Sequence, residues 1–277
     1  MFHATAMVRS YDAAMSRLQH LFGLQSLEYS EMRDPAIARN GGMTWLGDGS
    51  LELCEPNTVG AAPDRFVERT GGGMQGVALW VDDFAATVEH LERLGVAVPV
   101  QLDGFGFSSP RSTDGLQLEW SEFTIDQDPR VGAPAPVDHG APLVAVTHLA
   151  FVAAVVDDPR ATAQRFAELL GTRITFDDAH ARPDAPAVGV DLGDCTLALH
   201  QLDPPSSVTT WGHRHDRPRV AAMGLRVAAL DAARDALARA SVALVHDGAD
   251  RIVVAPEHTG DVEVVLVAEL LPGDPRA

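Results

Sequence analysis

The chain repeats itself, and this repeat limits what it can fold into more than any other feature. Residues 81–98 align with residues 227–244 at a constant offset of 146 residues. Upstream, residues 3–23 align with residues 148–171, with His3 matched to His148, at offsets of 145 and 148 residues. Two homologous halves explain both alignments, so we expect two similar modules.

Within each half a smaller unit occurs twice. It consists of an apolar strand, a helix of about three turns, and short strands separated by Gly-Asp or Asp-Gly turns. In the first half we predict helices at about 10–21 and 83–94, because apolar residues recur there at helical spacing. Ser or Asp side chains before these helices, and Gly after them, are typical of helix ends. The pattern therefore predicts an α+β fold of four βαβββ units, two in each half.

A Pro-rich segment separates the two halves. Residues 124–142 contain four prolines and no apolar periodicity, so neither a helix nor a strand ladder is expected there. We predict a first module at 1–124, a linker at 125–142 and a second module at 143–277.

Composition excludes several classes of function. The chain of 277 residues has 21 basic and 39 acidic residues, a formal net charge of −18, which argues against a nucleic-acid partner. No apolar run reaches the ~18 residues of a membrane span, and residues 1–9 lack a leader pattern. Cys54 and Cys195 are the only cysteines, which suits a reducing compartment. We expect a cytoplasmic monomer or homodimer that binds a small molecule and no membrane.

Five short motifs follow one another along the first half: His3 on the opening strand, LFGL at 21–24, LELCEP at 51–56, GVALWVDD at 76–83 and DGLQLE at 114–119. In this order and spacing they resemble the vicinal oxygen chelate superfamily of glyoxalase I, methylmalonyl-CoA epimerase, extradiol dioxygenases and bleomycin-resistance proteins. The resemblance implies two tandem glyoxalase-like modules, each a curled mixed sheet with its helices outside. In that family each sheet forms a cup, and metal-binding members place one ligand on each of four strands inside it.

Carried onto this sequence, the resemblance predicts a metal site of His3, Glu52 and Glu119. The fourth family position, normally His, is Gly76, and the neighbouring Gln75 could contribute only if a bulge turned it inward. An imidazole and two carboxylates suit Mn, Mg, Fe, Co or Ni better than a structural Zn. The alternative is no cofactor, with both glutamates facing bulk solvent.

The second module retains less of this pattern. His148 matches His3, whereas Ala222 stands at the Gly76 position and Val264 at that of Glu119. Glu263 is one residue away from Val264, which would put it on the opposite face of the strand. The Glu52 position falls on Ala198 or His200, depending on how the strand is aligned. A second site of His148 and His200 is one hypothesis, and ordinary cup histidines are the other.

Two aromatic residues are candidates for substrate binding together with Gln75 and Gly76. Trp80 shares a strand face with Gly76, where the missing imidazole would leave room for a substrate. Phe107 lies in a Gly-rich stretch that could form a lid. Both residues could equally serve packing alone. His213 and His215 are predicted to lie in an exposed loop.

The resemblance leaves several functions open. The favoured hypothesis is a lyase or isomerase in the N-terminal cup, where a divalent metal stabilises an enediolate of a small carbonyl or hydroxy metabolite. The general base would be Glu52, Glu119 or a metal-bound water. The alternative is a metal-free protein that sequesters a drug or metabolite, with a cationic ligand attracted by the net charge. An extradiol-type dioxygenase is less favoured, because the second module lacks two expected ligands. The second half could also be structural, replacing a dimer partner.

Overall fold

The protein is described by a computed structural model that covers residues 3–24, 26–46, 49–124, 141–178, 187–202 and 216–276. The predicted linker at 125–142 lies almost entirely outside these residues, as do His213 and His215, so the linker and the module boundaries stay predictions.

The first sheet has eight strands in the order β2-β3-β4-β1-β5-β8-β7-β6. Their bounds are β1 His3–Met7, β2 Ser26–Met32, β3 Arg39–Leu46, β4 Gly49–Pro56, β5 Gly73–Trp80, β6 Val100–Leu102, β7 Phe105–Phe107 and β8 Gln117–Ser121. Within the sheet β1 pairs parallel to β4 and antiparallel to β5, so the sheet is mixed.

The second sheet repeats this order as β10-β11-β12-β9-β13-β16-β15-β14. Its strands are β9 Val146–Val156, β10 Ile174–Asp177, β11 Ala187–Asp191, β12 Thr196–Gln201, β13 Arg219–Val227, β14 Leu244–Asp247, β15 Arg251–Val254 and β16 Val264–Val267. The predicted fold of four βαβββ units in two modules is confirmed.

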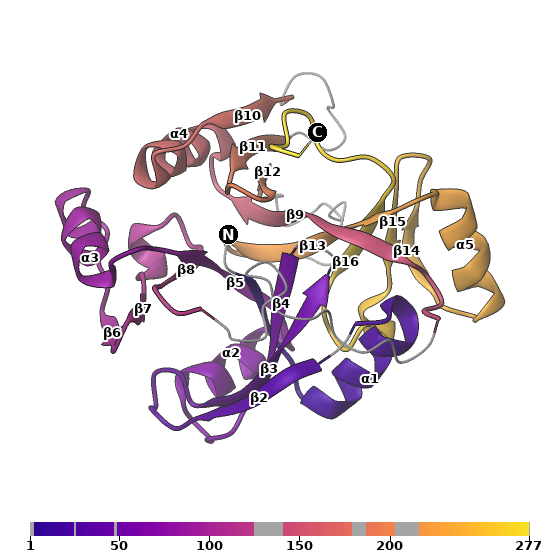
Figure 1. Cartoon of the computed structure of the whole chain (residues 1–277), viewed down its shortest axis with the longest axis horizontal. Coiled ribbons are helices and arrows are strands. Elements are labelled where there is room, and N and C mark those ends of the chain that lie inside the picture. Colours follow the sequence, from indigo (N-terminus) through magenta and orange to yellow (C-terminus); the bar gives the residue numbers. More distant parts are fainter. Residues whose placement is uncertain are drawn as a thin grey trace.

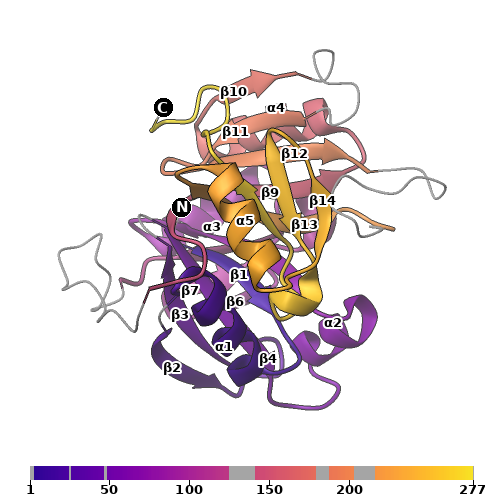
Figure 2. The same ribbon diagram turned by 90° about the vertical axis from the view of Figure 1, so that its right-hand side faces the viewer.

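Helices cover the outer faces of both sheets (Figures 1 and 2). They are α1 Tyr11–Phe22, α2 Ala62–Thr70, α3 Phe84–Arg93, α4 Pro159–Leu170 and α5 Leu230–Arg239, with short 3-10 segments η1 Pro110–Ser112 and η3 Pro256–His258. The helix α2, between β4 and β5, was not predicted, because its nine residues include few large apolar side chains.

The predicted helix ends are present. Ser10 and Asp83 accept hydrogen bonds from backbone amides in the first turns of α1 and α3, and Asp158 does the same for α4. Gly23 and Gly171 end α1 and α4 in the left-handed conformation. These caps fix where each helix leaves its sheet.

The two modules pack with β13 against β5 and contact each other in a quasi-symmetric way. From α1, Arg17 donates to the carbonyl of Glu257 in η3 at 2.6 Å. From α4, Arg165 donates to the carbonyl of Ser112 in η1 at 2.6 Å and to Asp114 at 2.9 Å. The first helix of each module thus holds the 3-10 segment of the other, as the two halves of a dimer would.

Candidate functional site in the N-terminal cup

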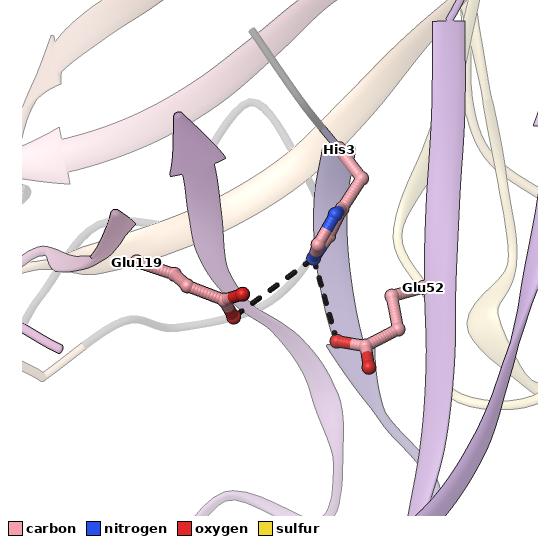
Figure 3. A group of neighbouring side chains, drawn as sticks. All are labelled: His3, Glu52 and Glu119. Atoms are coloured by element: carbon pink, nitrogen blue, oxygen red, sulfur yellow. Dashed lines mark ion pairs between the residues drawn. The ribbon is translucent and has the colours of Figure 1, made fainter. Parts of the chain in front are cut away.

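Three side chains from three strands meet inside the first cup. The Nε2 atom of His3 lies 3.4 Å from Glu52 Oε2 and 4.0 Å from Glu119 Oε2 (Figure 3). One donor atom from each residue lies within 4.8 Å of the others, and all three residues are buried. The residues that sequence reasoning grouped are therefore brought together.

The strand register explains this convergence. Thr5, two residues after His3, pairs with Glu52 on β4, while His3 itself pairs with Ala78 on β5. Ala78 in turn pairs with Glu119 on β8. Because paired residues share a face of the sheet, and alternate residues of a strand do so too, all three side chains point into the cup.

Sequence reasoning missed Arg39, the first residue of β3. Its Nη2 atom lies 3.0 Å from each of the two Glu52 oxygens and 3.8 Å from Glu119 Oε2. The guanidinium also lies over the ring of Phe107, 5.7 Å from the ring centroid. The signal that could have identified Arg39 is its position in β3. Arg39, Gly41 and Met43 are alternate residues on one face of this strand, and Met43 pairs with Glu52, so Arg39 shares the face of Glu52.

The two carboxyl groups are in different electrostatic environments. Burial would raise the pKa of Glu52, but the positive charge of Arg39 and the contact with His3 hold that pKa well below its usual range. Burial raises the pKa of Glu119, and the negative charge of Glu52 adds to this rise against the opposing effects of His3 and Arg39. Two neighbouring carboxyls with pKa values displaced in opposite directions are typical of acid–base sites.

The cluster has a donor set that fits a divalent metal ion. The two carboxylates are hard ligands and the imidazole is a borderline one, a set that suits first-row divalent ions. Donors at about 2.1 Å from an ion lie up to ~4 Å apart, near the spacing here. Glu119 Oε2 is buried and has no hydrogen-bond partner among the described residues, and coordination to an ion would compensate it. In the structure Arg39 is a cation that contacts these same carboxylates.

The structure contains the bulge that the Gln75 hypothesis required. Thr5 pairs with Gly76 and Ala6 with Met74, so Gln75 is skipped in the β1–β5 register. The half-buried Gln75 lines a cavity with Phe66, Arg219 and other residues, and none of His3, Glu52 and Glu119 lines that cavity. A Cβ atom at Gly76 would lie 2.7 Å from the carbonyl oxygen of Gln117. The expectation that the missing imidazole leaves room for a substrate is therefore wrong, since backbone fills that position.

The two aromatic candidates lie in different surroundings. Trp80 is 56% exposed at the end of β5, and it lines a surface cavity beside α3 and α4. Phe107 is buried, and it lines a cavity of about 480 Å³ together with Gln117, Arg65 and the segment around Pro35. Phe107, which also lies under the guanidinium of Arg39 and pairs with Glu119 on β8, links this cavity to the cluster.

In the second module, apolar residues stand at the ligand positions. The helix caps Ser10 and Asp158 are 148 residues apart, which makes Phe151, and not His148, the counterpart of His3.

The positions of the two glutamates are also apolar in this module. Phe151 pairs with Gly224, and Gly224 pairs with Val265, so Val265 and not Val264 occupies the position of Glu119. Ala198, paired with Ala153, occupies that of Glu52. Glu263 shares the cup face with Val265 and is not on the opposite face as expected.

The structure separates the two histidines predicted for this module. His148 pairs with Arg226, and His200 pairs with Val155, seven residues further along β9. At ~3.3 Å per residue this is roughly 23 Å, too far for one metal ion. The hypothesis of a shared His148–His200 site is therefore wrong. It matched His148 to His3 at an offset of 145 residues, whereas the first strands and helices of the two modules align at an offset of 148 residues.

The second cup encloses a cavity of about 410 Å³. Its lining includes Phe151, Ala198, Val267, Leu270, Leu271 and His200. The C-terminal segment that supplies Leu270 and Leu271 is anchored by Arg276, which pairs with Asp274 and donates to the carbonyls of Leu149 and Ala150.

Comparisons with known proteins agree with this architecture. Residues 2–105 match the family model of the Glyoxalase/Bleomycin resistance protein/Dioxygenase superfamily. A mutant of 4-hydroxymandelate synthase from Streptomyces coelicolor is similar over 99% of this chain and 94% of its own, with a TM-score of 0.67 and 15% identity. Methylmalonyl-CoA epimerase from Mycobacterium tuberculosis aligns with 44% of this chain and 87% of its own, with a TM-score of 0.41 and 19% identity. No curated protein sequence matches the chain.

None of the helices in the described ranges is long and apolar enough to cross a membrane.

Proposed function

We propose that this chain is a tandem two-module member of the vicinal oxygen chelate superfamily and that its N-terminal cup is the active site of a metal-assisted isomerase or lyase. Its substrate is a small carbonyl or hydroxy metabolite. The observation that carries this proposal is the convergence of His3 Nε2 with the carboxylates of Glu52 and Glu119 in a buried cup.

His3, Glu52 and Glu119 are the residues that would hold the metal. When bound, a divalent ion polarises a carbonyl oxygen and stabilises the negative charge that develops beside it. The donor set favours an ion with oxygen preference, such as Mn²⁺ or Mg²⁺, over structural zinc.

Proton transfer is assigned to Glu119. Its partner across the sheet, Phe107, and its near neighbour Gln117 both line the cavity of about 480 Å³, so Glu119 is the carboxyl of the cluster that a substrate would reach. Glu52 is engaged by Arg39 through both of its oxygens. A carboxyl in a buried site can take a proton from the carbon next to a carbonyl and return it to the neighbouring position.

Phe107 and Gln117 bind and enclose the substrate. The apolar wall around Phe107 excludes water from the reacting carbon, and the amide of Gln117 can hydrogen-bond a substrate oxygen. Trp80 lies in a different cavity, so we place it outside the substrate site.

The test is metal content of untagged protein, measured for the wild type and for Glu119→Ala. The expected result is one equivalent of metal in the wild type and a large loss in the variant. Glu122→Ala is the matched control, because Glu122 accepts from the Phe84 amide at the start of α3 and lies outside the cluster. Absence of metal from all three proteins, even after incubation with Mn²⁺, would remove the proposal.

A second function is favoured by the second cup, namely metal-free binding of an apolar cation. Apolar residues replace the ligands there, the cavity of about 410 Å³ is largely apolar, and Asp178, Asp250 and Glu269 line it against a single Arg251. Tetraphenylphosphonium should bind, its anionic isostere tetraphenylborate should bind far more weakly, and Ala198→Trp should abolish binding. Equal binding of the two ions would contradict this role.

A further inference from the structure

The guanidinium of Arg39 lies beside Glu52 and Glu119, where a metal ion bound by these carboxylates would lie. Its Nη2 atom is closer to both carboxylates than the imidazole of His3 is: 3.0 Å against 3.4 Å for Glu52, and 3.8 Å against 4.0 Å for Glu119. A single nitrogen is thus equidistant from the two oxygens of Glu52 and faces Glu119. This is the geometry of a counter-ion seated between two acids.

A buried pair of carboxylates needs such a charge. Glu52 and Glu119 are each 7% exposed and Arg39 is 4% exposed, so water screens the cluster very little. Without a cation, two acids this close in a medium of low dielectric constant would repel each other strongly. Arg39 therefore explains how the cup is stable when no metal is bound.

The same geometry makes Arg39 and a metal mutually exclusive. Hard divalent ions bind carboxylate oxygens at about 2.0–2.6 Å, which would place an ion within a few ångströms of a guanidinium still seated on Glu52. Like charges at that separation in a buried site are strongly unfavourable. Arg39 must leave Glu52 before the ion can bind.

The neighbourhood offers the guanidinium an alternative position. Arg39 already lies over the face of Phe107, and Phe107 lines the adjoining cavity of about 480 Å³. The Nε atom of Arg39 is buried without a hydrogen-bond partner among the described residues. The interactions of this side chain other than those with the two glutamates are therefore few, and a rotation toward the cavity would break little else.

We propose that Arg39 is a built-in counter-cation of this cup, which occupies the carboxylate Glu52 in the metal-free protein and competes with a divalent metal ion for it. The proposal rests on the metal site proposed above. It makes Arg39 a positioning residue that sets the metal affinity of the cup from within the chain.

The experiment is calorimetric titration of Mn²⁺ into the metal-free wild type, Arg39→Met, Arg39→Lys and Arg65→Met. Methionine keeps much of the apolar stem and removes the charge, so R39M should bind Mn²⁺ at least tenfold more tightly than the wild type. Lysine restores a positive charge, so R39K should bind within a few-fold of the wild type. Arg65 lines the same cavity but contacts the carbonyl of Gly60 instead of the cluster, so R65M should bind as the wild type does.

The outcomes separate the two proposals. Equal or weaker binding of Mn²⁺ by R39M would overturn the competition while leaving the metal site in place, since a purely structural arginine can only weaken the site when removed. No binding by any of the four proteins would overturn both proposals.

A second measurement covers the case in which R39M does not fold. The guanidinium Nε–Hε signal of Arg39 in the wild type, assigned by its loss in R39K, is followed by NMR while diamagnetic Mg²⁺ is added. Competition predicts a change in this signal that saturates with metal, while the Arg65 signal stays constant. A constant Arg39 signal at saturating Mg²⁺ would overturn the proposal.

Discussion

At the level of single residues, buried ion pairs hold the side chains of the N-terminal cup in place, because water screens their charges very little. Arg39 contacts both oxygens of Glu52, and both side chains are almost completely buried. Removing one member of a buried pair leaves an uncompensated charge, whereas replacing both by apolar groups is often nearly neutral. The stability of the cup should therefore depend on the pair as a unit.

Glu52→Leu tests this dependence. The variant should lose about 3 kcal/mol of unfolding free energy, because the guanidinium of Arg39 remains buried with only Glu119 at 3.8 Å. The double variant Arg39→Met/Glu52→Leu should recover most of that loss. Urea unfolding of metal-free protein measures both. Additive losses in the double variant would show that the two residues act independently.

A second buried acid gives a pH dependence. Burial raises the pKa of Glu263 from 4.5 to about 8, although the positive charge of Arg219 opposes the rise. The folded state thus keeps a proton that the unfolded state has lost. This contribution to stability is complete below pH 4.5 and disappears as the pH rises through about 8.

The wild type should lose up to ~1.4 kcal/mol of stability per pH unit over this window relative to Glu263→Gln, whose side chain does not titrate. Urea unfolding of both proteins at intervals from pH 5 to pH 8.5 measures the two slopes. Parallel slopes would mean that Glu263 ionises normally in the folded protein.

At the scale of elements, strand register determines which residues can form a site. The sequence was sufficient to predict the four units, because helix caps and apolar periodicity are local signals. It predicted the His3–Glu52–Glu119 group through a resemblance, since nothing local shows that three distant strands share one cup. Arg39 was missed for the same reason: an arginine at the start of a strand resembles a surface residue until its pairing is known.

The error in the second module was also one of register. An alignment on histidine gave an offset of 145 residues, while the helix caps give 148. Because β9 spans 11 residues, from Val146 to Val156, it contains more than one position at which a histidine could be aligned. The structure selects Phe151, whose ring lies against Gly224 on β13.

Gly224→Ala tests this contact between β9 and β13. A Cβ atom at Gly224 would overlap the ring of Phe151, so the variant should lose about 1–3 kcal/mol of unfolding free energy. In a Phe151→Ala background the same substitution should cost almost nothing, which thermal or urea unfolding of the four proteins can measure. An equal loss of unfolding free energy in both backgrounds would contradict the contact between the Phe151 ring and Gly224.

At the scale of the whole molecule, the two modules behave as a dimer joined in one chain. Arg17 and Arg165 make equivalent contacts across the interface, and Gly260 of the second module lies directly on Ala14 of α1. This supports the view that the second module serves partly as a structural partner for the first, while its own cup is apolar.

Gly260→Val should weaken this interface. Both Gly260 and Gly95 have positive φ values, +69° and +75°, but a Cβ atom would overlap Ala14 only at Gly260, and Gly95 faces open space. Gly95→Val therefore reports backbone strain alone, and Gly260→Val should cost about 1–3 kcal/mol more. Urea unfolding of the intact chain gives the comparison, and equal losses would contradict the close packing of the modules.

The proposed metal centre holds one divalent ion between His3, Glu52 and Glu119. Crystals grown with Mn²⁺ and measured at the manganese absorption edge would reveal this ion. The expected result is one anomalous peak between His3 Nε2 and the two carboxylates, with Arg39 turned away from Glu52. An anomalous map with no peak in the N-terminal cup at saturating Mn²⁺, and with Arg39 still on Glu52, would contradict the account.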